Sequence, residues 1–309
     1  MTEHSWLLVS GFGAHIKSTR EKLIIQQKNE NKEYSLDEVK NLLIVGGHTL
    51  SSTTVAHLIH NGVFISFFEP NGNPVGIIRP FGDRSHEEIH EMQREVARYR
   101  YATAIAEGSI RSRILAIEST QEIRNVKLLY EGELEFLYKA REEIPYLIKL
   151  DEIRRLHKLT TDMYYEIMSR SMHHDLGFRR RTIRPQSDPV NAMLSFGYAT
   201  LFGNCCVSVI GARFDPDIGL MSEGKGSLVY DLIEPMKSVM IDPVVFQIAR
   251  ESLTPSDFEQ TPTRCILSDN LMKNLIKSFH KSIALDKIEE QITNLYNAMT
   301  EGSEFKVVN

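Results

Sequence analysis

Residues 188–212, DPVNAMLSFGYATLFGNCCVSVIGA, decide how the second half of this chain folds. The 24 residues from Pro189 to Ala212 include no charged side chain, and Asp188 followed by proline is typical of a helix start. A run of this length can cross a bilayer, but it contains polar residues such as Asn191 and Asn204, and the sequence has no second such run. We therefore predict a buried helix at the centre of an α-helical region, and no membrane span.

The segment after this helix predicts a loop and then a short helix with paired carboxylates. Asp215-Pro216 and Gly219 are typical of a turn. Asp231 and Glu234 follow, and their spacing of three residues places them on one face of a helix. Two carboxylates on one face are able to hold a hard divalent cation, although a solvated helix face has the same pattern.

An arginine-rich segment precedes the uncharged helix. Four of the seven residues 178–184 are arginines, and Pro185 disfavours a helix at this point because the residue before a proline avoids the helical conformation. Guanidinium groups match the geometry of phosphate oxygens, so this segment is a candidate contact to a nucleic-acid backbone. A solvated, salt-bridged loop has the same composition. The four arginines are Arg179, Arg180, Arg181 and Arg184.

The first part of the chain predicts a β-rich domain with one helix. Short apolar runs separated by glycines predict strands, and residues 51–60 predict a helix that starts near Ser51 or Ser52. Residues 70–74, with the sequence PNGNP, predict a tight turn between two strands. The apolar runs are residues 6–10, 22–26, 41–45 and 64–68.

From Glu87 onward the spacing of apolar residues becomes helical, beginning with one continuous pattern from Ile89 to Thr103. Later segments have the same period, so the fold class is predicted as α+β. We expect a β-rich domain at residues 1–84 and a larger all-α domain at residues 85–309, with a frayed tail after Glu301.

Composition limits the functional classes. The 309 residues have a net charge of −5, which excludes a uniformly basic nucleic-acid binder and leaves room for a local basic patch. Three cysteines form neither a disulfide framework nor a metal-binding spacing. The first residues lack the apolar run of a signal peptide. We therefore predict a cytoplasmic protein.

Taken together, these segments resemble the CRISPR-associated integrase family, the universal endonuclease-like proteins of spacer acquisition. A single motif would be weak, but all of them occur in order, and the resemblance covers nearly the whole chain. The matching segments are residues 188–198, 215–219, 231–235, 10–16, 44–51 and 67–76.

The resemblance implies an N-terminal β domain joined to a larger helical domain. It also implies a homodimer built largely through the β domains, with two such dimers assembling around a small partner dimer. DNA is the implied substrate. Active members of the family bind one Mn or Mg ion through a glutamate, a histidine and an aspartate or glutamate.

Two of these three metal positions are substituted here. His157 stands at the position of the family's glutamate, seven residues before Tyr164 of a tyrosine pair. Ser222 stands at the position of the histidine, three residues after the loop glycine. The third position matches Glu234, with Asp231 one turn before it.

These substitutions predict a degraded metal site. Mn and Mg favour carboxylates, and His157, Ser222 and Glu234 supply one negative charge where the family set supplies two. Asp231 is able to add a second charge, but from the same helix as Glu234. We therefore expect no metal cofactor. As a further hypothesis, His157 is a proton-bearing cation that is hydrogen-bonded to Glu234 in the old metal position.

Three functional hypotheses stay open. The first, which the resemblance and the substitutions favour, is a homologue that binds DNA as a homodimer without the metal-dependent reaction. The second is an active Mn- or Mg-dependent endonuclease and integrase that uses His157, Glu234 and Asp231. The third is a helical interaction protein with no role on DNA. Under the first hypothesis, the expected DNA contacts are Arg179, Arg180, Arg181, Arg184, Asn191 and Lys225.

Overall fold

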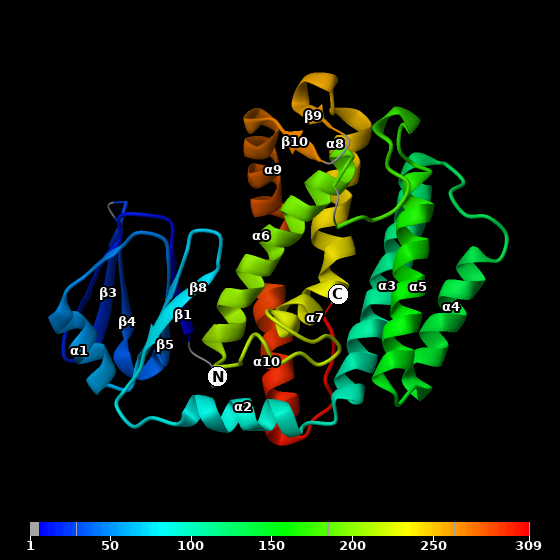
Figure 1. Ribbon diagram of the computed structural model, residues 1–309. Coiled ribbons are helices and arrows are strands. Elements are labelled where there is room, and N and C mark those ends of the chain that lie inside the picture. The colour runs from blue at the N-terminus through cyan, green and yellow to red at the C-terminus, as the bar shows by residue number, and fades with distance from the viewer. Residues whose placement is uncertain (1–5, 29, 184–185, 262–263, 309) are drawn as a thin grey trace.

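The computed structural model describes residues 6–28, 30–183, 186–261 and 264–308. A strand-rich N-terminal region lies on one side of the molecule, and helices α2 to α10 with one small hairpin make up the rest (Figure 1). The α+β fold class is therefore confirmed. The division into domains at residues 84 and 85 stays a prediction.

The N-terminal region contains two four-stranded sheets and helix α1 (Ser52–His60). The helix begins where the sequence predicts, because the Ser51 hydroxyl accepts a hydrogen bond from the Thr54 N–H at 3.1 Å. One sheet has the order β1-β5-β7-β8, with β1 (Trp6–Ser10), β5 (Asn41–Val45), β7 (Phe64–Phe68) and β8 (Pro74–Ile78). The other has the order β4-β3-β2-β6, with β2 (His15–Ser18), β3 (Lys22–Gln27), β4 (Glu30–Ser35) and β6 (Thr49–Leu50).

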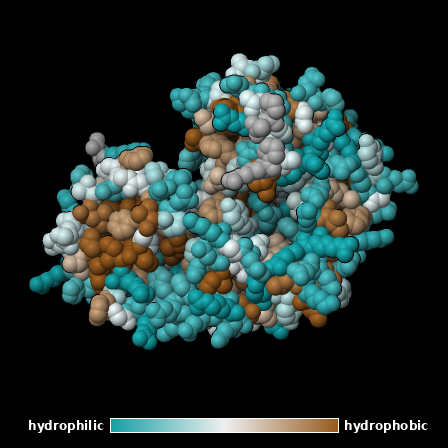
Figure 2. Space-filling view, in the orientation of Figure 1, coloured by the Kyte–Doolittle hydropathy of each residue, from teal (hydrophilic) through white to brown (hydrophobic). Residues whose placement is uncertain are grey.

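The predicted strands are all present, and the structure adds β2, β4 and β6. β4 has the sequence ENKEYS, which contains no apolar run, so its pairing with β3 is what makes it a strand. Apolar residues from both sheets and α1 form one core cluster, while Leu43 and Phe68 pack with Val207 of the helical region. Apolar side chains also gather on the surface of the strand-rich region (Figure 2).

The predicted continuous helix from Ile89 to Thr103 is wrong, because the chain breaks between α2 (Ser85–Glu95) and α3 (Arg98–Arg124). Val96 has an extended conformation, with φ −60° and ψ 149°. The break lets α2 cross beneath the other helices while α3 runs beside α5 (Figure 1). Both helices bury apolar residues in the same core, so the apolar period continues across the break.

The helical region follows the predicted pattern and adds a small hairpin. After α3, its helices are α4 (Glu133–Glu143), α5 (Leu150–Ser169), α6 (Pro189–Gly211), α7 (Ser227–Met236), α8 (Asp242–Glu251), α9 (Asp269–Ser282) and α10 (Leu285–Glu301). The hairpin consists of β9 (Phe258–Gln260) and β10 (Cys265–Leu267). A π-helical turn, η4 (Lys237–Ile241), joins α7 to α8. Short 3₁₀ turns lie at Leu36–Glu38, Ile144–Tyr146, His174–Leu176 and Pro255–Asp257.

Helix α6 is the central core helix that the sequence predicts. Asp188 caps it, with Oδ1 accepting from the Asn191 N–H at 2.8 Å. It is the one helix within the described residues that is long and apolar enough to cross a membrane, and more than half of that stretch is buried inside the protein. It packs against α7, α8, α9 and α10 on one side and against β5 and β7 on the other.

A close backbone contact joins the strand-rich region to α6. The turn after β7 places Gly72 against Gly203, and a Cβ atom added to Gly203 would lie 1.9 Å from the Asn71 carbonyl oxygen. Asn41 on β5 donates from Nδ2 to the Gly211 carbonyl at 3.1 Å. Small residues on α6 therefore set how closely the two parts of the chain approach.

The expectation of a frayed tail after Glu301 is wrong. Phe305 is buried with its ring centroid 5.8 Å from that of Tyr101, and Val307 packs against Gly108 of α3. The Val308 N–H donates to Gln291 Oε1 at 3.1 Å. Alternating apolar residues in the tail thus give it a buried face.

Candidate functional site

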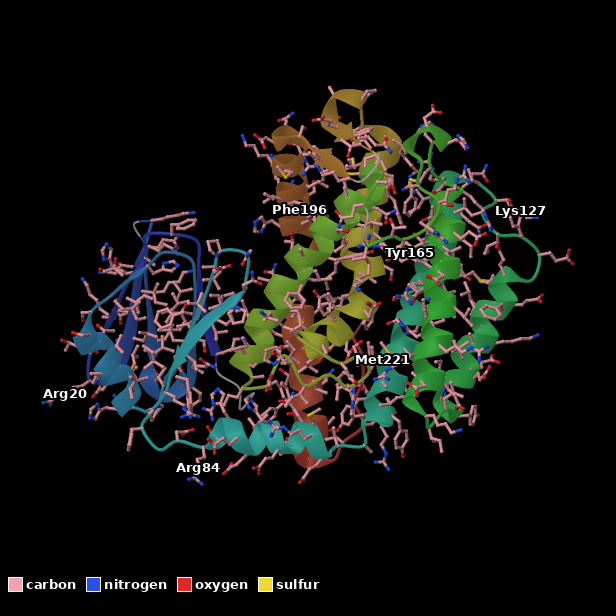
Figure 3. The ribbon with its side chains drawn as sticks, viewed as in Figure 1. Arg20, Arg84, Lys127, Tyr165, Phe196 and Met221 are labelled. Atoms are coloured by element: carbon pink, nitrogen blue, oxygen red, sulfur yellow. The ribbon has the colours of Figure 1, made fainter. Side chains whose placement is uncertain are left out.

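The structure brings together His157 and Glu234, two of the three positions that the resemblance assigns to metal ligands. His157 lies on α5 and Glu234 on α7, and both helices pack against α3. His157 Nε2 is 3.7 Å from Glu234 Oε2, and both side chains are largely buried. Figure 3 draws the side chains of this region and labels Tyr165 on α5 and Met221 on the loop before α7.

Arg113 of α3 is the residue that sequence reasoning missed at the centre of the site. Its side chain is only 2% exposed, and Nη2 donates to Glu234 Oε2 at 2.9 Å. Its Nη1 lies 3.3 Å from His157 Nε2. A guanidinium only donates, so His157 Nε2 is the acceptor and the imidazole is neutral with its proton on Nδ1.

Lys237 supplies a second positive charge to the same carboxylate. It is the first residue of the π-helical turn, and its ammonium donates to Glu234 Oε1. Pro235 lies inside α7 just before this turn and has no N–H to donate to the preceding helical turn, which favours the altered hydrogen bonding. Each oxygen of Glu234 is therefore held by a different cation.

The electrostatics follow from this arrangement. Burial by itself would raise the pKa of Glu234, but the positive charges of Lys237 and Arg113 outweigh it and lower that pKa to about 2. Burial, reinforced by Arg113, lowers the pKa of His157 to about 3, so the imidazole is neutral at pH 7. The hypothesis that His157 is the cation in the old metal position is therefore wrong. Arg113 and Lys237 carry that charge.

Asp231 and Glu234 have separate partners despite lying on one short helix. Asp231 is fully buried, and its Oδ2 accepts from the N–H groups of Leu220 and Met221, each at 2.8 Å. The Ser222 N–H donates to both carboxylate oxygens at 3.0 Å. Burial raises the pKa of Asp231, and these hydrogen bonds oppose the rise. Asp231 thus organises the loop at 220–222, which also contains Ser222.

These residues do not fit an Mn or Mg ion. Such an ion needs several oxygen ligands directed at one point. Both oxygens of Glu234 accept from cations, and both oxygens of Asp231 accept from backbone amides. Across the part of the chain that the structure describes, no three His, Cys, Asp or Glu side chains are placed to hold a metal ion.

A buried layer of tyrosines lies beside the ion pairs. Tyr198 of α6 and Tyr164 of α5 donate to the two oxygens of Asp242, at 2.5 and 2.9 Å. The Tyr165 and Tyr198 hydroxyls are 2.5 Å apart. Burial raises the pKa of Asp242 to about 6, with the tyrosine hydrogen bonds opposing the rise. Lys237 Nζ lies 5.0 Å from the centre of the Tyr198 ring, so this layer adjoins the cluster at Glu234.

The arginine-rich segment is divided between exposed and anchored residues. Arg179 and Arg180 are exposed. Arg181 donates to Asn191 Oδ1 at 3.0 Å and to Ser195 Oγ at 2.8 Å. Asn191 is buried, and its amide donates to the Arg180 carbonyl at 2.9 Å and to Asp188 at 2.7 Å.

The remaining predicted contacts lie apart from this anchor. Arg184 falls outside the described residues. Lys225 is exposed on the loop before α7. Arg181 and Asn191 are engaged within the protein, which leaves Arg179, Arg180 and Lys225 as the side chains that face solvent.

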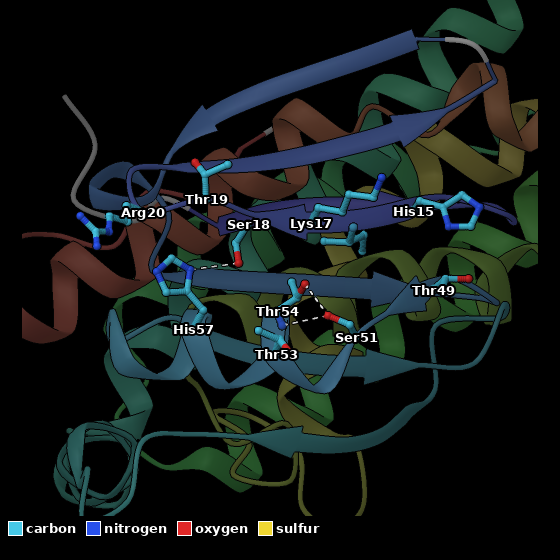
Figure 4. A pocket seen from close by; sticks show the side chains of 11 residues that line it. His15, Lys17, Ser18, Thr19, Arg20, Thr49, Ser51, Thr53, Thr54 and His57 are labelled. Atoms are coloured by element: carbon cyan, nitrogen blue, oxygen red, sulfur yellow. Dashed lines mark hydrogen bonds between the residues drawn. The ribbon is translucent and has the colours of Figure 1, made fainter.

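A surface pocket of about 620 Å³ lies in the strand-rich region between β2 and α1 (Figure 4). Its lining includes Lys17, Arg20 and His57, and His57 Nδ1 is 3.0 Å from Ser18 Oγ. None of the described residues that line it has a carboxylate, and all of them belong to residues 15–57 of the strand-rich region, whereas Glu234 lies on α7.

Comparisons with known proteins agree with the resemblance seen in the sequence. The profile of the family described as "CRISPR associated protein Cas1" matches residues 7–281. "Putative CRISPR-associated endonuclease Cas1 2" of Methanospirillum hungatei JF-1 is 40% identical over 301 residues, which is 97% of this chain and 99% of that protein.

Two solved structures share the fold. A casposase bound to integration product has a TM-score of 0.82 at 18% identity, covering 98% of this chain and 97% of its own. A partial Cas6-RT-Cas1–Cas2 complex has a TM-score of 0.77 at 19% identity, covering 99% and 98%. At 18% and 19% identity, the structural similarity shows a shared fold and nothing further.

Proposed function

Because the chain belongs to the Cas1 family of CRISPR-associated proteins, we propose that it is a spacer-acquisition integrase homologue that binds DNA as a homodimer without a working metal site. The family and the integrase fold agree with DNA as the ligand. The solved relatives include one bound to integration product and one in a Cas1–Cas2 complex. A small partner subunit of that kind is therefore part of the proposal.

One observation carries the loss of the metal site: Arg113 and Lys237 both contact Glu234. Two fixed monovalent cations have the same total charge as one divalent ion. An Mn or Mg ion at Glu234 would have to displace both, and it would gain only a neutral imidazole and a serine in return. The charge of Glu234 is therefore neutralised by side chains of the protein itself.

The proposed DNA contacts are the exposed Arg179, Arg180 and Lys225. A local basic patch is able to bind phosphates even when the net charge is −5, because binding depends on where the charges lie. Asn191 and Arg181 support this surface by holding the backbone of residues 180–182. Both are therefore proposed as positioning residues and not as phosphate contacts.

The homodimer is proposed through the strand-rich region. β8 is an edge strand, and all five of its residues are exposed, including Val75, Ile77 and Ile78. An exposed apolar edge is a surface that another chain tends to cover. Ile77→Lys should therefore shift the protein toward monomer in sedimentation velocity, and an unchanged dimer would contradict this surface.

DNA binding is tested by measuring the affinity for a branched duplex with and without a chelator. We expect chelator to leave the affinity unchanged and Arg179→Ala/Arg180→Ala to reduce it about tenfold or more, because each lost phosphate contact lowers affinity. Arg20→Ala/Arg94→Ala, at one exposed position in the strand-rich region and one on α2, is the matched control for loss of two positive charges. Equal loss in both variants would contradict the assignment of Arg179 and Arg180.

The metal site is tested by adding Mn to the wild type and to restored variants. His157→Glu/Ser222→His should bind no Mn in calorimetry while Arg113 and Lys237 remain. The same variant with Arg113→Gln and Lys237→Gln should bind Mn, provided that circular dichroism shows it folded. Strand cleavage by the wild type that requires Mn and disappears in Glu234→Ala would instead establish the active endonuclease.

A further inference from the structure

A second glutamate–arginine cluster lies outside the buried site, on the loop that precedes α7. Glu223 accepts from Arg154 Nη2 of α5 at 2.9 Å, and Arg98 Nη1 of α3 lies 3.6 Å from the same oxygen. The Glu223 side chain is 70% exposed, and those of Arg98 and Arg154 are about one-third exposed. Two guanidinium groups from two helices thus meet at one solvent-accessible carboxylate.

Both arginines are held in place by contacts that do not involve Glu223. Arg98 donates from Nε to the Leu220 carbonyl at 3.3 Å and from Nη2 to the Ser222 carbonyl at 3.0 Å. Arg154 donates from Nε to the Met221 carbonyl at 2.5 Å. If Glu223 moved away, these bonds would keep both guanidinium groups directed at the same place.

The loop that carries Glu223 is fixed at both ends. Asp231 holds the backbone N–H groups of residues 220–222, and Asp217 Oδ1 accepts from the Gly226 N–H at 2.7 Å. Gly224 and Gly226 have φ values of +99° and +70°, a region that glycine adopts without strain. Residues 223–225 therefore form a short arc between two anchors, and Glu223 fastens this arc to α3 and α5.

We propose that Arg98 and Arg154 form a binding site for a DNA backbone phosphate, and that Glu223 occupies this site as an internal competitor until a phosphate displaces it. The proposal rests on the proposed DNA binding. Guanidinium groups donate to phosphate oxygens in the same geometry as to a carboxylate, so the two anions exchange on the same donors. Lys225 lies two residues from Glu223 and is exposed, so the same arc carries a further cation for the same backbone.

The chemistry of the cluster favours exchange of the Glu223 carboxylate for a DNA phosphate. A solvent-exposed ion pair holds weakly, because water and salt compete for both partners. A duplex presents phosphates in a dense row, and each phosphate that is bound releases counterions. Glu223 therefore occupies the two arginines in the absence of DNA, and a phosphate is able to replace it.

The test compares two variants that each remove one negative charge from Arg154. Glu223→Gln removes the competitor on the loop. Asp151→Asn removes a carboxylate that also contacts Arg154, at 3.0 Å, but lies on the same helix and does not fasten the loop. Binding of a fluorescein-labelled branched duplex is measured by anisotropy across a series of NaCl concentrations.

We expect Glu223→Gln to bind about three- to tenfold more tightly than wild type, and to add roughly one to the magnitude of the salt slope. Asp151→Asn should change the affinity by less, and Arg154→Gln should weaken binding. Hydrogen exchange gives the second measurement. Amides of residues 223–225 should exchange faster in Glu223→Gln than in wild type, and DNA should raise their exchange in wild type to that level.

The possible outcomes separate this inference from the proposed function. Equal gains in Glu223→Gln and Asp151→Asn, with unchanged loop exchange, would mean that charge alone acts and would overturn the internal competitor. Wild-type binding that depends on Arg179 and Arg180 but is unaffected by Arg154→Gln would overturn the phosphate site and leave the proposed function standing. Absence of DNA binding in every variant would overturn both.

Discussion

Glu234 and Glu223 lie eleven positions apart in the sequence and are each held by two cations, yet they lie in opposite environments. Glu234 contacts Arg113 and Lys237 with only 17% of its side chain exposed. Glu223 contacts Arg154 and Arg98 with 70% exposed. Each carboxylate has two cationic partners, so we attribute the different roles of the two clusters to the difference in burial.

Burial changes what happens when a partner is removed. A buried carboxylate that loses its cation is left as an uncompensated charge in a medium that solvates it poorly. An exposed carboxylate regains water instead. The cluster at Glu234 is therefore a fixed part of the helical core, and the cluster at Glu223 is able to open and close.

The largest expected effect is that of Arg113→Met, which leaves Glu234 with one cation and His157 without its donor. We expect the free energy of unfolding to fall by about 3–5 kcal/mol, the range for breaking a buried ion pair. The free energy of unfolding is measured by urea denaturation, with circular dichroism as the signal. Arg154→Met, at the exposed cluster, is the matched control and should have a much smaller effect. Similar losses of stability in the two variants would contradict the view that burial determines the cost of losing a cationic partner.

Asp242 extends the comparison to a buried carboxylate whose hydrogen bonds come from hydroxyls and not from cations. Burial raises its pKa from 3.8 to about 6, whereas Lys237 and Arg113 lower that of Glu234 to about 2. A carboxyl group with a raised pKa in the folded state contributes its full stability below the unfolded pKa. That contribution is lost as the pH rises through the folded pKa.

We therefore expect wild type to lose stability relative to Asp242→Asn as the pH rises from about 4 to about 7. A difference of two pKa units corresponds to at most about 3 kcal/mol. Melting temperatures across this pH range, compared with those of Asp162→Asn on the exposed face of α5, measure the effect. A constant difference between wild type and Asp242→Asn would show that the carboxyl does not titrate in this range.

Much of this fold could be predicted from the sequence, because the signals involved are local. The uncharged run at 189–212 gave the central helix, and Asp188 and Ser51 marked helix starts that the structure confirms. The break at Val96 was missed because α2 and α3 bury apolar residues in the same core, so their spacing carries no sign of a change in direction. The ordered tail was missed because its buried face depends on Gly108 of α3, far away in the sequence.

Less of the candidate site than of the fold could be predicted from the sequence. Spacing within motifs aligned His157 and Glu234, and the structure does place them side by side. Nothing local marks Arg113 among 36 lysines and arginines, since its role depends on α3 packing against both α5 and α7. Lys237 meets Glu234 across the helix distortion after Pro235, which the sequence alone does not specify. The residues that neutralise the site therefore become visible only once the helices are packed.

The smallest expected effect is a response to salt, and it tests the contrast without changing any residue. Raising NaCl from 0.05 to 0.5 M shortens the screening length to roughly 4 Å, which weakens exposed ion pairs and leaves buried ones nearly intact. We expect hydrogen exchange at residues 223–225 to rise several-fold in wild type, while amides around Arg113 and Glu234 stay unchanged. Glu223→Gln should show no such rise, because its loop has no ion pair to screen. A salt-induced rise of similar size in α3 or α7 would mean that solvent reaches both clusters, and burial would then no longer account for the difference between them.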